Sequence, residues 1–476
     1  MGKLFFKFDK IEDICISNSI MPIKPTTPKG TRDFSSKEVA RRNYLKQVLQ
    51  QVFETFGFQP IETPSFERLE TLTGVYGEEG ERLVFKILNS GDKVKKADTN
   101  ALAEGKTQKF IHSLSEKALR YDLTVPFARF VAQHQNELTF PFRRYQIQPV
   151  WRADRPQHGR FQEFYQCDAD IVGNRSLWQE IEMLSLYDKV FESLKIEGVK
   201  IKLNHRKILA GIAGLLGADS KLIAFTVALD KLDKIGKEGV INELKSNHFS
   251  SESLGKLDQL LDLKGDAFEQ METLESLLSD QPEGLEGIKE LKFVLDQIGL
   301  APLKGSNICF DLTLARGLHY YTGMIVEVSA PETIKMGSIG GGGRYDDLTG
   351  TFGMKDTSGI GISFGFERIY LVMDELGLFP ETLNKTTQVM FANFGDESVS
   401  VAFQYLNELR DNNIACELYP SEVKLKKQLA YANDKKISKV VLIGSEELKQ
   451  NTFLLKDMDT GIQTTYSLTE LVSLLS

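Results

Sequence analysis

The stretch Val150-Trp-Arg-Ala-Asp-Arg-Pro-Gln-His-Gly-Arg-Phe-Gln-Glu-Phe-Tyr-Gln166 predicts a strand, a loop and a second strand, with three arginines spread across them. Arg152, Arg155 and Arg160 offer planar, permanently charged groups that suit phosphate oxygens. A proline and a glycine punctuate the loop between the strands. Although scattered arginines on a hairpin usually mark a solvated turn, this order predicts a site that holds a nucleotide triphosphate beside a small polar substrate.

The second strand determines which other groups share this site. Successive side chains of a strand point to opposite faces. One face therefore carries a ring, an amide and two carboxylates, from Phe164, Gln166, Asp168 and Asp170. The other face carries Glu163, Tyr165 and Cys167.

Composition places the chain among ordinary globular proteins. Its 476 residues suggest about three domains, and 41% of them are hydrophobic while 26% are charged. A net charge of -8 argues against a uniformly basic coat, so any RNA contact would need local basic patches. No segment is long and apolar enough to span a bilayer, and the first twenty residues do not resemble a secretory signal.

The four cysteines are too far apart to suggest a zinc site or a disulfide framework. Cys15, Cys167, Cys309 and Cys416 include no CxxC pair and no nearby histidine cluster. We therefore expect a reducing cytoplasm and no metal held by protein ligands alone.

The stretch from Val150 to Gln166 resembles motif 2 of class II aminoacyl-tRNA synthetases, and its loop resembles the version found in histidyl-tRNA synthetases. The resemblance implies that Arg152 and Arg160 bind ATP, with Arg152 also catalytic. It further implies that Phe164 stacks on adenine, and that Asp154 faces the adenine amino group or orders the loop. Gln157 would touch the acceptor end of tRNA. Gln166 and Asp170 would line the histidine pocket.

The segment Leu119-Arg-Tyr-Asp-Leu-Thr-Val-Pro126 resembles the part of the family that binds the substrate ammonium. The resemblance assigns this role to Asp122 and Thr124, which lie on the same side if the chain is extended here. A carboxylate is a suitable acceptor for an ammonium group. Without the resemblance, Asp122 would be interpreted as a loop cap.

The segment Leu314-Ala-Arg-Gly-Leu-His-Tyr-Tyr-Thr-Gly323 resembles the histidine-specific signature of the family. By this resemblance Arg316 is catalytic and lies beside the histidine carboxylate and the α-phosphate, while Tyr321 helps to bind the imidazole. His319 departs from the family pattern, which usually has aspartate there. Its charge can change near pH 7, so the orientation of Arg316 and Tyr321 is in question.

Two glycine-containing segments follow. Gly337-Ser-Ile-Gly-Gly-Gly-Gly-Arg-Tyr-Asp346 lacks the ending of a P-loop; by resemblance Tyr345 lines the amino-acid pocket, while the alternative is a glycine-rich turn without a ligand. Gly359-Ile-Gly-Ile-Ser-Phe-Gly-Phe-Glu-Arg368, with a helix over 369–376, resembles class II motif 3. Arg368 would then point at the γ-phosphate; the alternative is a buried strand and an exposed arginine.

The N-terminal region predicts an amphipathic helix that ends near Phe56. Ser35 and Glu38 form a possible capping box, and apolar residues follow at helical spacing. Such a stripe can form a core or a dimer interface, and it is usually core. Gly30-Thr-Arg-Asp-Phe34 and this helix resemble motif 1, which implies a homodimer. The polar segment 89–116 suggests a mobile insertion near the site entrance or an ordinary surface loop.

The domain prediction is an α+β catalytic core, an antiparallel sheet flanked by helices, interrupted by a helical insertion and followed by an α/β domain. We expect a dispensable extension at 1–20, core segments at 21–205 and 304–380, and the insertion at 206–303, which by resemblance leans over the tRNA acceptor stem. Residues 386–476 would form a domain with a mainly parallel sheet. A lysine cluster there is usually a solvated face, but by resemblance it binds the anticodon stem and loop: Lys424, Lys426, Lys427, Lys435, Lys436 and Lys439.

The resemblance therefore implies activation of histidine with ATP and Mg2+, and transfer of the histidyl group to tRNA(His). A first alternative is a non-catalytic histidine sensor, the regulatory subunit of ATP phosphoribosyltransferase. The three arginines Arg152, Arg316 and Arg368 and the basic C-terminal domain count against it, because a sensor needs neither. A second alternative is a synthetase for another amino acid, which the segment from Arg316 to Tyr321 disfavours.

Overall fold

The computed structural model describes residues 24–218, 221–229, 231–315, 320–346, 348–384 and 387–475. The predicted extension at 1–20 lies outside these residues. The stretch from Val150 to Gln166 forms the end of β5 (Phe142–Trp151), a loop, and the start of β6 (Glu163–Val172), as the sequence predicts.

These two strands belong to an eight-stranded sheet of the order β1-β5-β6-β11-β10-β9-β7-β8. The pairs β6–β11, β11–β10, β10–β9 and β9–β7 are antiparallel, while β1–β5 and β7–β8 are parallel. The α+β prediction is confirmed. The remaining strands are β1 (Gln59–Pro60), β7 (Val199–His205), β8 (Ser306–Phe310), β9 (Met324–Ser329), β10 (Gly340–Tyr345) and β11 (Gly359–Phe364).

The glycine-rich segment is a central strand, so the alternative of a glycine-rich turn is wrong for residues 340–345. Strand β10 pairs with β9 on one side and β11 on the other. A Cβ atom on Gly342 would lie 2.1 Å from the carbonyl oxygen of Gly361. Glycine is needed here because the neighbouring backbone leaves no room for a side chain.

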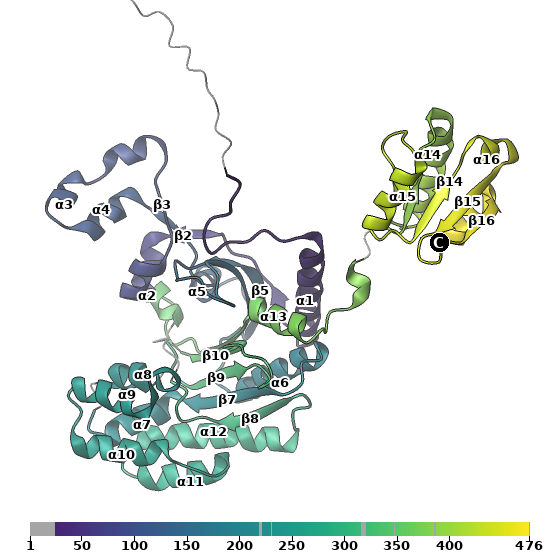
Figure 1. Cartoon of the computed structure of the whole chain (residues 1–476). Coiled ribbons are helices and arrows are strands. Elements are labelled where there is room, and N and C mark those ends of the chain that lie inside the picture. Colours follow the sequence, from purple (N-terminus) through teal and green to yellow (C-terminus); the bar gives the residue numbers. More distant parts are fainter. Residues whose placement is uncertain are drawn as a thin grey trace, which may run out of the picture. The chain divides into compact units, whose positions relative to one another are not determined.

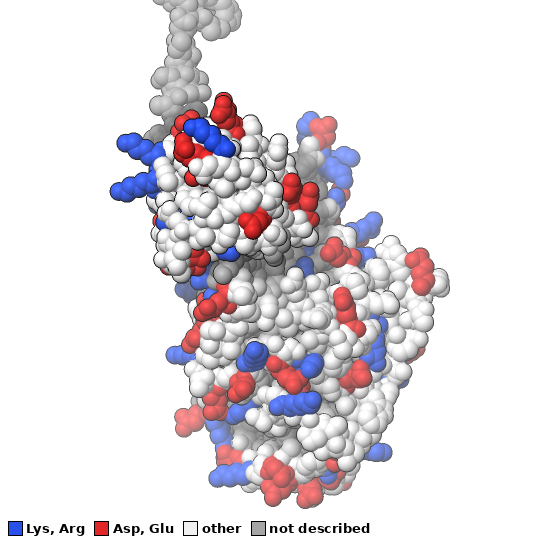
Figure 2. Space-filling view, turned by 90° about the vertical axis from the view of Figure 1, so that its right-hand side faces the viewer, with Lys and Arg blue, Asp and Glu red and all other residues white. Residues whose placement is uncertain are grey.

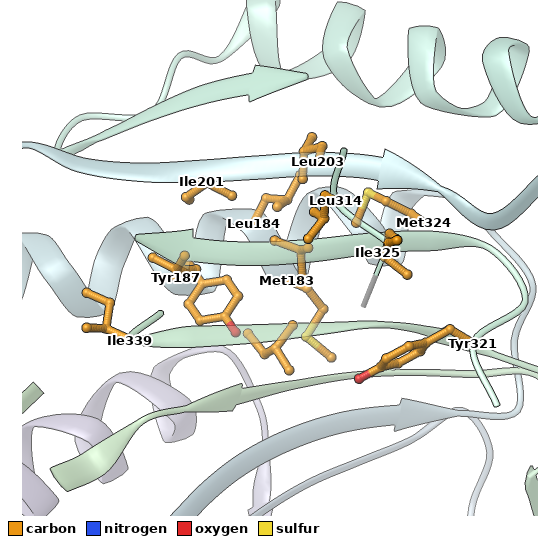
Figure 3. Packing of buried hydrophobic residues seen from close by; sticks show 14 of the residues in the cluster. Met183, Leu184, Tyr187, Ile201, Leu203, Leu314, Tyr321, Met324, Ile325 and Ile339 are labelled. Carbon is orange, nitrogen blue, oxygen red and sulfur yellow. The ribbon is translucent and has the colours of Figure 1, made fainter. Parts of the chain in front are cut away.

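Helices α1 (Ser36–Thr55), α6 (Trp178–Ser193) and α13 (Phe366–Glu375) accompany the sheet (Figure 1). The capping box of Ser35 and Glu38 is present at the start of α1. Its apolar stripe is buried in the hydrophobic core of its own chain, through Leu45, Leu49, Val52 and Phe53. The stripe is therefore core. Figure 3 shows another part of this core, with Met183, Leu314, Met324 and Tyr321 in one cluster.

A separate compact unit comprises residues 65–121 and 149–164 together with residues 24–33. It holds a three-stranded sheet of β2 (Phe66–Arg68), β4 (Lys117–Leu119) and β3 (Lys86–Ile87), beside α2 (Leu69–Leu83). The polar segment at 89–116 is not an irregular loop. It forms η1 (Gly91–Lys96), α3 (Thr99–Ala103) and α4 (Thr107–Leu114), and Asp98 caps α3.

Between Arg206 and Leu300, every element in the described residues is a helix, as expected for the helical insertion. Helices α7 and α12 pack against each other, and Gly211 allows this because its Cβ would lie 2.7 Å from the Cα of Gly284. They lie along β7 (Figure 1). The six helices are α7 (Arg206–Leu215), α8 (Leu222–Leu229), α9 (Leu232–Ser246), α10 (Ser251–Leu261), α11 (Ala267–Leu277) and α12 (Pro282–Leu300).

The C-terminal part has its own sheet of the order β13-β12-β14-β15-β16. The first three strands are parallel, as predicted, but β15 and β16 pair antiparallel, so the sheet is mixed rather than mainly parallel. Two apolar clusters lie in this part. Its strands are β12 (Val389–Phe391), β13 (Cys416–Leu418), β14 (Lys439–Leu442), β15 (Thr452–Asp457) and β16 (Gln463–Ser467); its helices are α14 (Asp396–Asp411), α15 (Leu425–Asp434), α16 (Ser445–Gln450) and α17 (Leu471–Leu475).

Candidate active site

Arg152 follows β5 directly, and its guanidinium is held in a defined orientation. Its Nε donates a hydrogen bond to the carbonyl oxygen of Tyr121 at 3.0 Å. The guanidinium carbon lies 4.3 Å from the ring centre of Tyr121 and 5.3 Å from that of Phe164. Cation–π contacts of this kind fix the plane of the charged group. The structure thus brings Arg152 and Phe164 together, two of the residues predicted to bind ATP.

The loop after Arg152 ends in a tight, exposed turn. The backbone of Gln157 and Arg160 exchanges two hydrogen bonds, of 3.1 and 2.9 Å, and Gly159 between them has φ 69°. Asp154 lies 3.8 Å from Arg160, and its carbonyl oxygen accepts a hydrogen bond from Gln162. Asp154 thus contacts two other residues of the loop, and both of its predicted roles stay predictions. Gln157 is exposed at the turn.

Three of the residues on the strand face predicted for the substrate lie on the buried half of β6. Gln166, Asp168 and Asp170 are at most 9% exposed, and the amide of Gln166 donates to Asp168 at 3.2 Å. Cys167 packs instead in the apolar core, with 0% exposure. The alternation of faces predicted from the sequence is therefore present along this strand.

Asp170 is held from two sides. The hydroxyl of Tyr345 on β10 donates to its Oδ1 at 2.6 Å, and Arg144 on β5 forms an ion pair with its Oδ2 at 2.7 Å. The guanidinium of Arg144 is fully buried, 4.1 Å from the ring centre of Phe127. A Cβ on Gly361 would lie only 2.0 Å from Asp170 Oδ1, so glycine at this position of β11 makes room for the carboxylate.

The chain at Asp122 is not extended as predicted, because α5 (Thr124–Gln133) begins two residues later. Asp122 accepts a hydrogen bond from the backbone of Val125 at 3.1 Å, which caps the first turn of the helix. The assumption that Asp122 and Thr124 share one side of an extended chain is therefore wrong. The structure nevertheless brings Asp122 close enough to Asp168 to raise the pKa of that carboxyl.

Burial and neighbouring charges control the pKa of the two buried carboxyls, Asp168 and Asp170. Burial raises the pKa of Asp168 to about 7; the nearby Arg144 opposes the shift, while Asp170 and Asp122 add to it. Burial also raises the pKa of Asp170, again against the effect of Arg144. Because the free energy of a buried carboxylate is lowered mainly by a nearby cation, the site is suited to a substrate that brings positive charge or hydrogen-bond donors.

Three tyrosine rings, Tyr320, Tyr321 and Tyr345, contact one another near Asp170. The ring centre of Tyr320 lies 4.8 Å from that of Tyr321 and 6.3 Å from that of Tyr345. Burial raises the pKa of Tyr320 and Tyr345 well above the usual value, so their hydroxyls stay protonated and can donate. Tyr320 also hydrogen-bonds with Thr124. Arg316 and His319, both singled out from the sequence, lie outside the described residues.

Three pocket residues had no predicted role: Arg144, Tyr320 and Asp168. Tyr320 was detectable because it precedes Tyr321 in the signature segment. Asp168 was placed on the correct strand face but not assigned to the substrate. Arg144 carries no sequence signal, since it is one of two adjacent arginines in a strand that also contains glutamines, and nothing in that pattern marks it for a buried ion pair.

The motif 3 segment forms β11 and the start of α13. Arg368 is the third residue of α13, and its Nη1 donates to the carbonyl oxygen of Ser338 at 2.5 Å. It is half-buried rather than exposed, in contrast to the alternative interpretation. The preceding Glu367 accepts two hydrogen bonds from Arg42 of α1, at 2.6 and 2.8 Å.

The C-terminal lysines are mostly exposed and lie on α15 and on either side of it in the sequence. Lys435 pairs with Glu417 at 3.0 Å, which balances part of the positive charge. On the face drawn in Figure 2, Lys and Arg side chains are interspersed with Asp and Glu side chains. A local patch rather than a broad basic surface is therefore the form that a phosphate contact would take here.

The mainly antiparallel sheet, with an arginine-bearing loop between two long strands, is the fold of the class II aminoacyl-tRNA synthetases. Within that class, the family model for histidyl-tRNA synthetase matches residues 93–369, and the model for an anticodon binding domain matches residues 388–476. The chain therefore belongs to the histidyl-tRNA synthetase family and is an enzyme of that family.

Two similar proteins align with this chain over nearly its whole length. A histidine–tRNA ligase of Christiangramia forsetii is 58% identical over 443 residues, which cover 93% of this chain and 97% of the relative. A histidine–tRNA ligase of Flavobacterium johnsoniae is 54% identical over 462 residues, with the same shares covered. These identities favour the ligase over the regulatory subunit.

Solved structures show the same fold. The histidyl-tRNA synthetase of Nostoc sp. PCC 7120 has a TM-score of 0.76 at 29% identity, with 95% of this chain and 99% of that chain covered. A Bacillus halodurans protein, an ATP phosphoribosyltransferase regulatory subunit/histidyl-tRNA synthetase, has a TM-score of 0.69 at 21% identity, covering 89% of this chain and 99% of that one. The second likeness shows the fold alone.

Two further observations concern metals and membranes. Within the described ranges, no group of three or more His, Cys, Asp and Glu side chains could hold a metal ion. No helix in the part of the chain that the structure describes is long and apolar enough to cross a membrane.

Proposed function

We propose that this enzyme activates histidine with ATP, releases pyrophosphate, and transfers the histidyl group to the 3′ end of tRNA(His), with the residues assigned below. The observation that carries the proposal is the buried Asp170, held by Tyr345 and Arg144 in a pocket where a ligand must supply hydrogen-bond donors. An imidazole ring has an N–H that can donate to a carboxylate.

This pocket supports selectivity for histidine over apolar amino acids. Asp170 is 3% exposed, so a side chain without a donor would bury the carboxylate further and add no hydrogen bond to those from Tyr345 and Arg144. A site built to hydrogen-bond a polar substrate can reject such an analogue by roughly 10,000-fold or more. Asp170 and Tyr321 would bind the imidazole edge, while Asp122, Thr124 and Gln166 would bind the ammonium end. Tyr345 would line the pocket and hold Asp170.

The first reaction step needs alignment and charge stabilisation rather than an enzyme nucleophile. The carboxylate of histidine attacks the α-phosphate of ATP, and negative charge develops on the phosphate oxygens. Arg152 and Arg316 would stabilise that charge, while Arg160 and Arg368 would hold the outer phosphates. Phe164 would stack on adenine, beside Asp154. Magnesium, carried by the phosphates of ATP, would supply further positive charge.

The fixed orientation of Arg152 supports its assigned role. Its Nε is already occupied by the carbonyl of Tyr121, so the outer edge of the guanidinium is the part that would turn toward phosphate. A guanidinium held in this way loses little conformational entropy on binding. Lysine at this position would keep the charge but would lose the planar pair of N–H donors that can bind two phosphate oxygens at once.

The RNA partner would contact other parts of the chain. The exposed Gln157 would touch the acceptor end of tRNA, and the insertion at 206–303 would lean over the acceptor stem. The lysine patch of residues 386–476 would bind the anticodon stem and loop. We further propose a cytoplasmic homodimer, with a catalytic core made of residues 21–205 and 304–380.

The proposal is tested by charging purified tRNA(His) with labelled histidine. Asp170→Asn should reduce charging at limiting histidine by at least about tenfold, because the amide is a weaker acceptor than the carboxylate it replaces. Asp188→Asn is the matched control, since Asp188 is similarly buried and accepts hydrogen bonds from the backbone of Lys304 and Gly305. Full charging by Asp170→Asn would contradict the assignment.

A further inference from the structure

Asp168 is a buried carboxylate in the histidine pocket for which the family resemblance gives no role. It is 3% exposed and lies on β6 between Gln166 and Asp170, opposite Ser363 of β11. Nothing in the proposed reaction uses it. Burying a carboxylate is costly, so its presence beside the substrate pocket calls for a function.

The contact between Asp168 and Gln166 suggests that function. The Nε2 of Gln166 donates to Oδ2 of Asp168 at 3.2 Å and to Oδ1 at 3.4 Å. An ionised carboxylate only accepts hydrogen bonds, whereas an amide has a donating and an accepting end. An ionised Asp168 therefore selects the NH2 end of the amide and turns the oxygen of Gln166 to the opposite side.

We propose that Asp168 is a positioning residue for substrate recognition, which holds the amide of Gln166 so that its oxygen accepts a hydrogen bond from the α-ammonium group of histidine. The inference rests on the proposed function, which assigns Gln166 to the substrate. With the amide turned over, its NH2 group would face the ammonium, and two donors would oppose each other. The orientation of the Gln166 amide thus decides whether the site can accept the α-ammonium group of histidine.

The charges around Asp168 make this orientation sensitive to pH. The groups that face it are one guanidinium, two carboxyls, one hydroxyl and one amide, from Arg144 of β5, Asp170 of β6, Asp122 before α5, Ser363 of β11 and Gln166 of β6. Tyr345 of β10 acts on this group through Asp170. Two further carboxyls therefore share one guanidinium with Asp168. Burial raises its pKa to about 7, against Arg144 and with help from Asp170 and Asp122.

The direction of the pH effect follows from the hydrogen bond. A protonated Asp168 can donate to the oxygen of Gln166, which turns the amide over and disfavours the ammonium. Histidine therefore binds better to the ionised form, so binding lowers the pKa of Asp168 and releases a proton. Affinity for histidine should rise as the pH increases through about 7.

Asp168→Asn tests the positioning role, because asparagine keeps the shape but can present either a donor or an acceptor to Gln166. We expect KM for histidine in pyrophosphate exchange to rise about tenfold at pH 8, the size expected for a hydrogen bond to a charged group. The KM for ATP and kcat should stay the same. In a Gln166→Ala background, Asp168→Asn should have no further effect on KM for histidine. Asp188→Asn is again the control for loss of a buried carboxylate.

Imidazolelactate, which carries a hydroxyl in place of the α-ammonium, separates positioning from a general disturbance of the pocket. Asp168→Asn should weaken histidine binding and leave imidazolelactate binding nearly unchanged. Equal weakening of both ligands would overturn the inference, as would an unchanged KM for histidine. If the unsubstituted enzyme binds no histidine at all, the proposed function fails instead, so the two failures are distinguishable.

Proton release provides a test on the unsubstituted enzyme, independent of whether any variant folds. Calorimetry at pH 7 in two buffers of different ionisation enthalpy gives the number of protons released on binding. Histidine should release more protons than imidazolelactate, since only histidine brings the ammonium that favours ionised Asp168. Because the ammonium group lowers the pKa of the neighbouring imidazole, the titration of each free ligand is measured separately and its contribution is subtracted. Equal release would overturn the inference.

Discussion

At the scale of single residues, the pocket depends on how one carboxylate is held. Asp170 receives a hydroxyl from Tyr345 and a guanidinium from Arg144, which come from two different strands. Burial works against its charge, and these partners restore part of the stability of the ionised form. Each partner should therefore affect histidine recognition without contacting ATP.

Tyr345→Phe tests this support. The substitution removes the 2.6 Å hydrogen bond to Asp170 and leaves the ring in place. A hydrogen bond to a charged group contributes about 1.5–3 kcal/mol, so KM for histidine should rise by roughly 10- to 100-fold with KM for ATP unchanged. Tyr187→Phe is the control, because that hydroxyl donates to the backbone of Ser363. Similar effects of both variants on KM for histidine would refute the assignment.

Gly361→Ala tests the space that Asp170 occupies. The added methyl group would lie 2.0 Å from Oδ1, so the carboxylate or strand β11 must move. Misplacing a binding group by about 1 Å can cost on the order of 100-fold in rate, and we expect histidine-dependent pyrophosphate exchange to fall by that amount. Gly350→Ala should leave exchange intact, because nothing lies within 4 Å of its added methyl group. Normal exchange by Gly361→Ala would show that the pocket tolerates the shift.

The residues of this pocket differ in how far the sequence could predict them. Gln166 and Asp170 were predictable because strand alternation and a family motif agree on them. The pairing of Arg144 with Asp170 was not, since it depends on which side chains face each other across β5 and β6. The extended chain predicted at Asp122 failed because the capping hydrogen bond to Val125 begins a helix there, although capping was the alternative that the residue type itself favoured.

At the scale of elements, helix α1 is tied to α13 by a buried ion pair. Arg42 and Glu367 have side chains 10% and 5% exposed and share two hydrogen bonds. The Arg42 guanidinium also lies 4.1 Å from the ring centre of Phe34 and 5.4 Å from that of Tyr165. Because α13 carries Arg368, this pair stabilises the helix on which a proposed ATP contact depends.

Glu367→Ala should therefore destabilise the protein strongly. Removing one partner of a buried pair leaves an uncompensated charge, which costs about 3–5 kcal/mol. Glu70→Ala should cost no more than about 1 kcal/mol, because its partner Arg68 is 80% exposed and Glu70 is 76% exposed. Urea unfolding followed by circular dichroism compares the two. Equal midpoints would mean that the buried pair contributes no more than the exposed one.

Helices and strands could be predicted from the sequence where the local pattern of residues and the packing in the folded protein favour the same structure. The capping box at Ser35 marks the start of α1 correctly because it is a local hydrogen-bond pattern. Strand β10 was open to interpretation as a turn, since its glycines have low strand propensity and are required only by the close approach of β11. The helices at 91–114 were missed because their polar composition matches an ordinary loop.

At the scale of the whole molecule, the C-terminal part has its own sheet and its own apolar clusters. It is matched by a separate family model. A part with its own core could in principle fold alone. Histidine activation and tRNA recognition should therefore be separable.

Deleting residues 387–476 tests this separation. The shortened chain should keep histidine-dependent pyrophosphate exchange, while charging of tRNA(His) at limiting tRNA falls by at least about tenfold through lost phosphate contacts. Replacing Lys426 and Lys427 by alanine in the full chain is the milder control and should weaken charging less. If exchange and charging fall together, the C-terminal part is needed for the catalytic core itself.

The central claim is that this chain activates histidine and no other amino acid. Pyrophosphate exchange with ATP, with each amino acid offered separately, tests it most directly because the assay requires neither tRNA nor the C-terminal part. We predict exchange with histidine alone. Histidine binding without exchange would contradict the account and favour a histidine sensor, and exchange with a different amino acid would contradict the assignment of Asp170 and Tyr321.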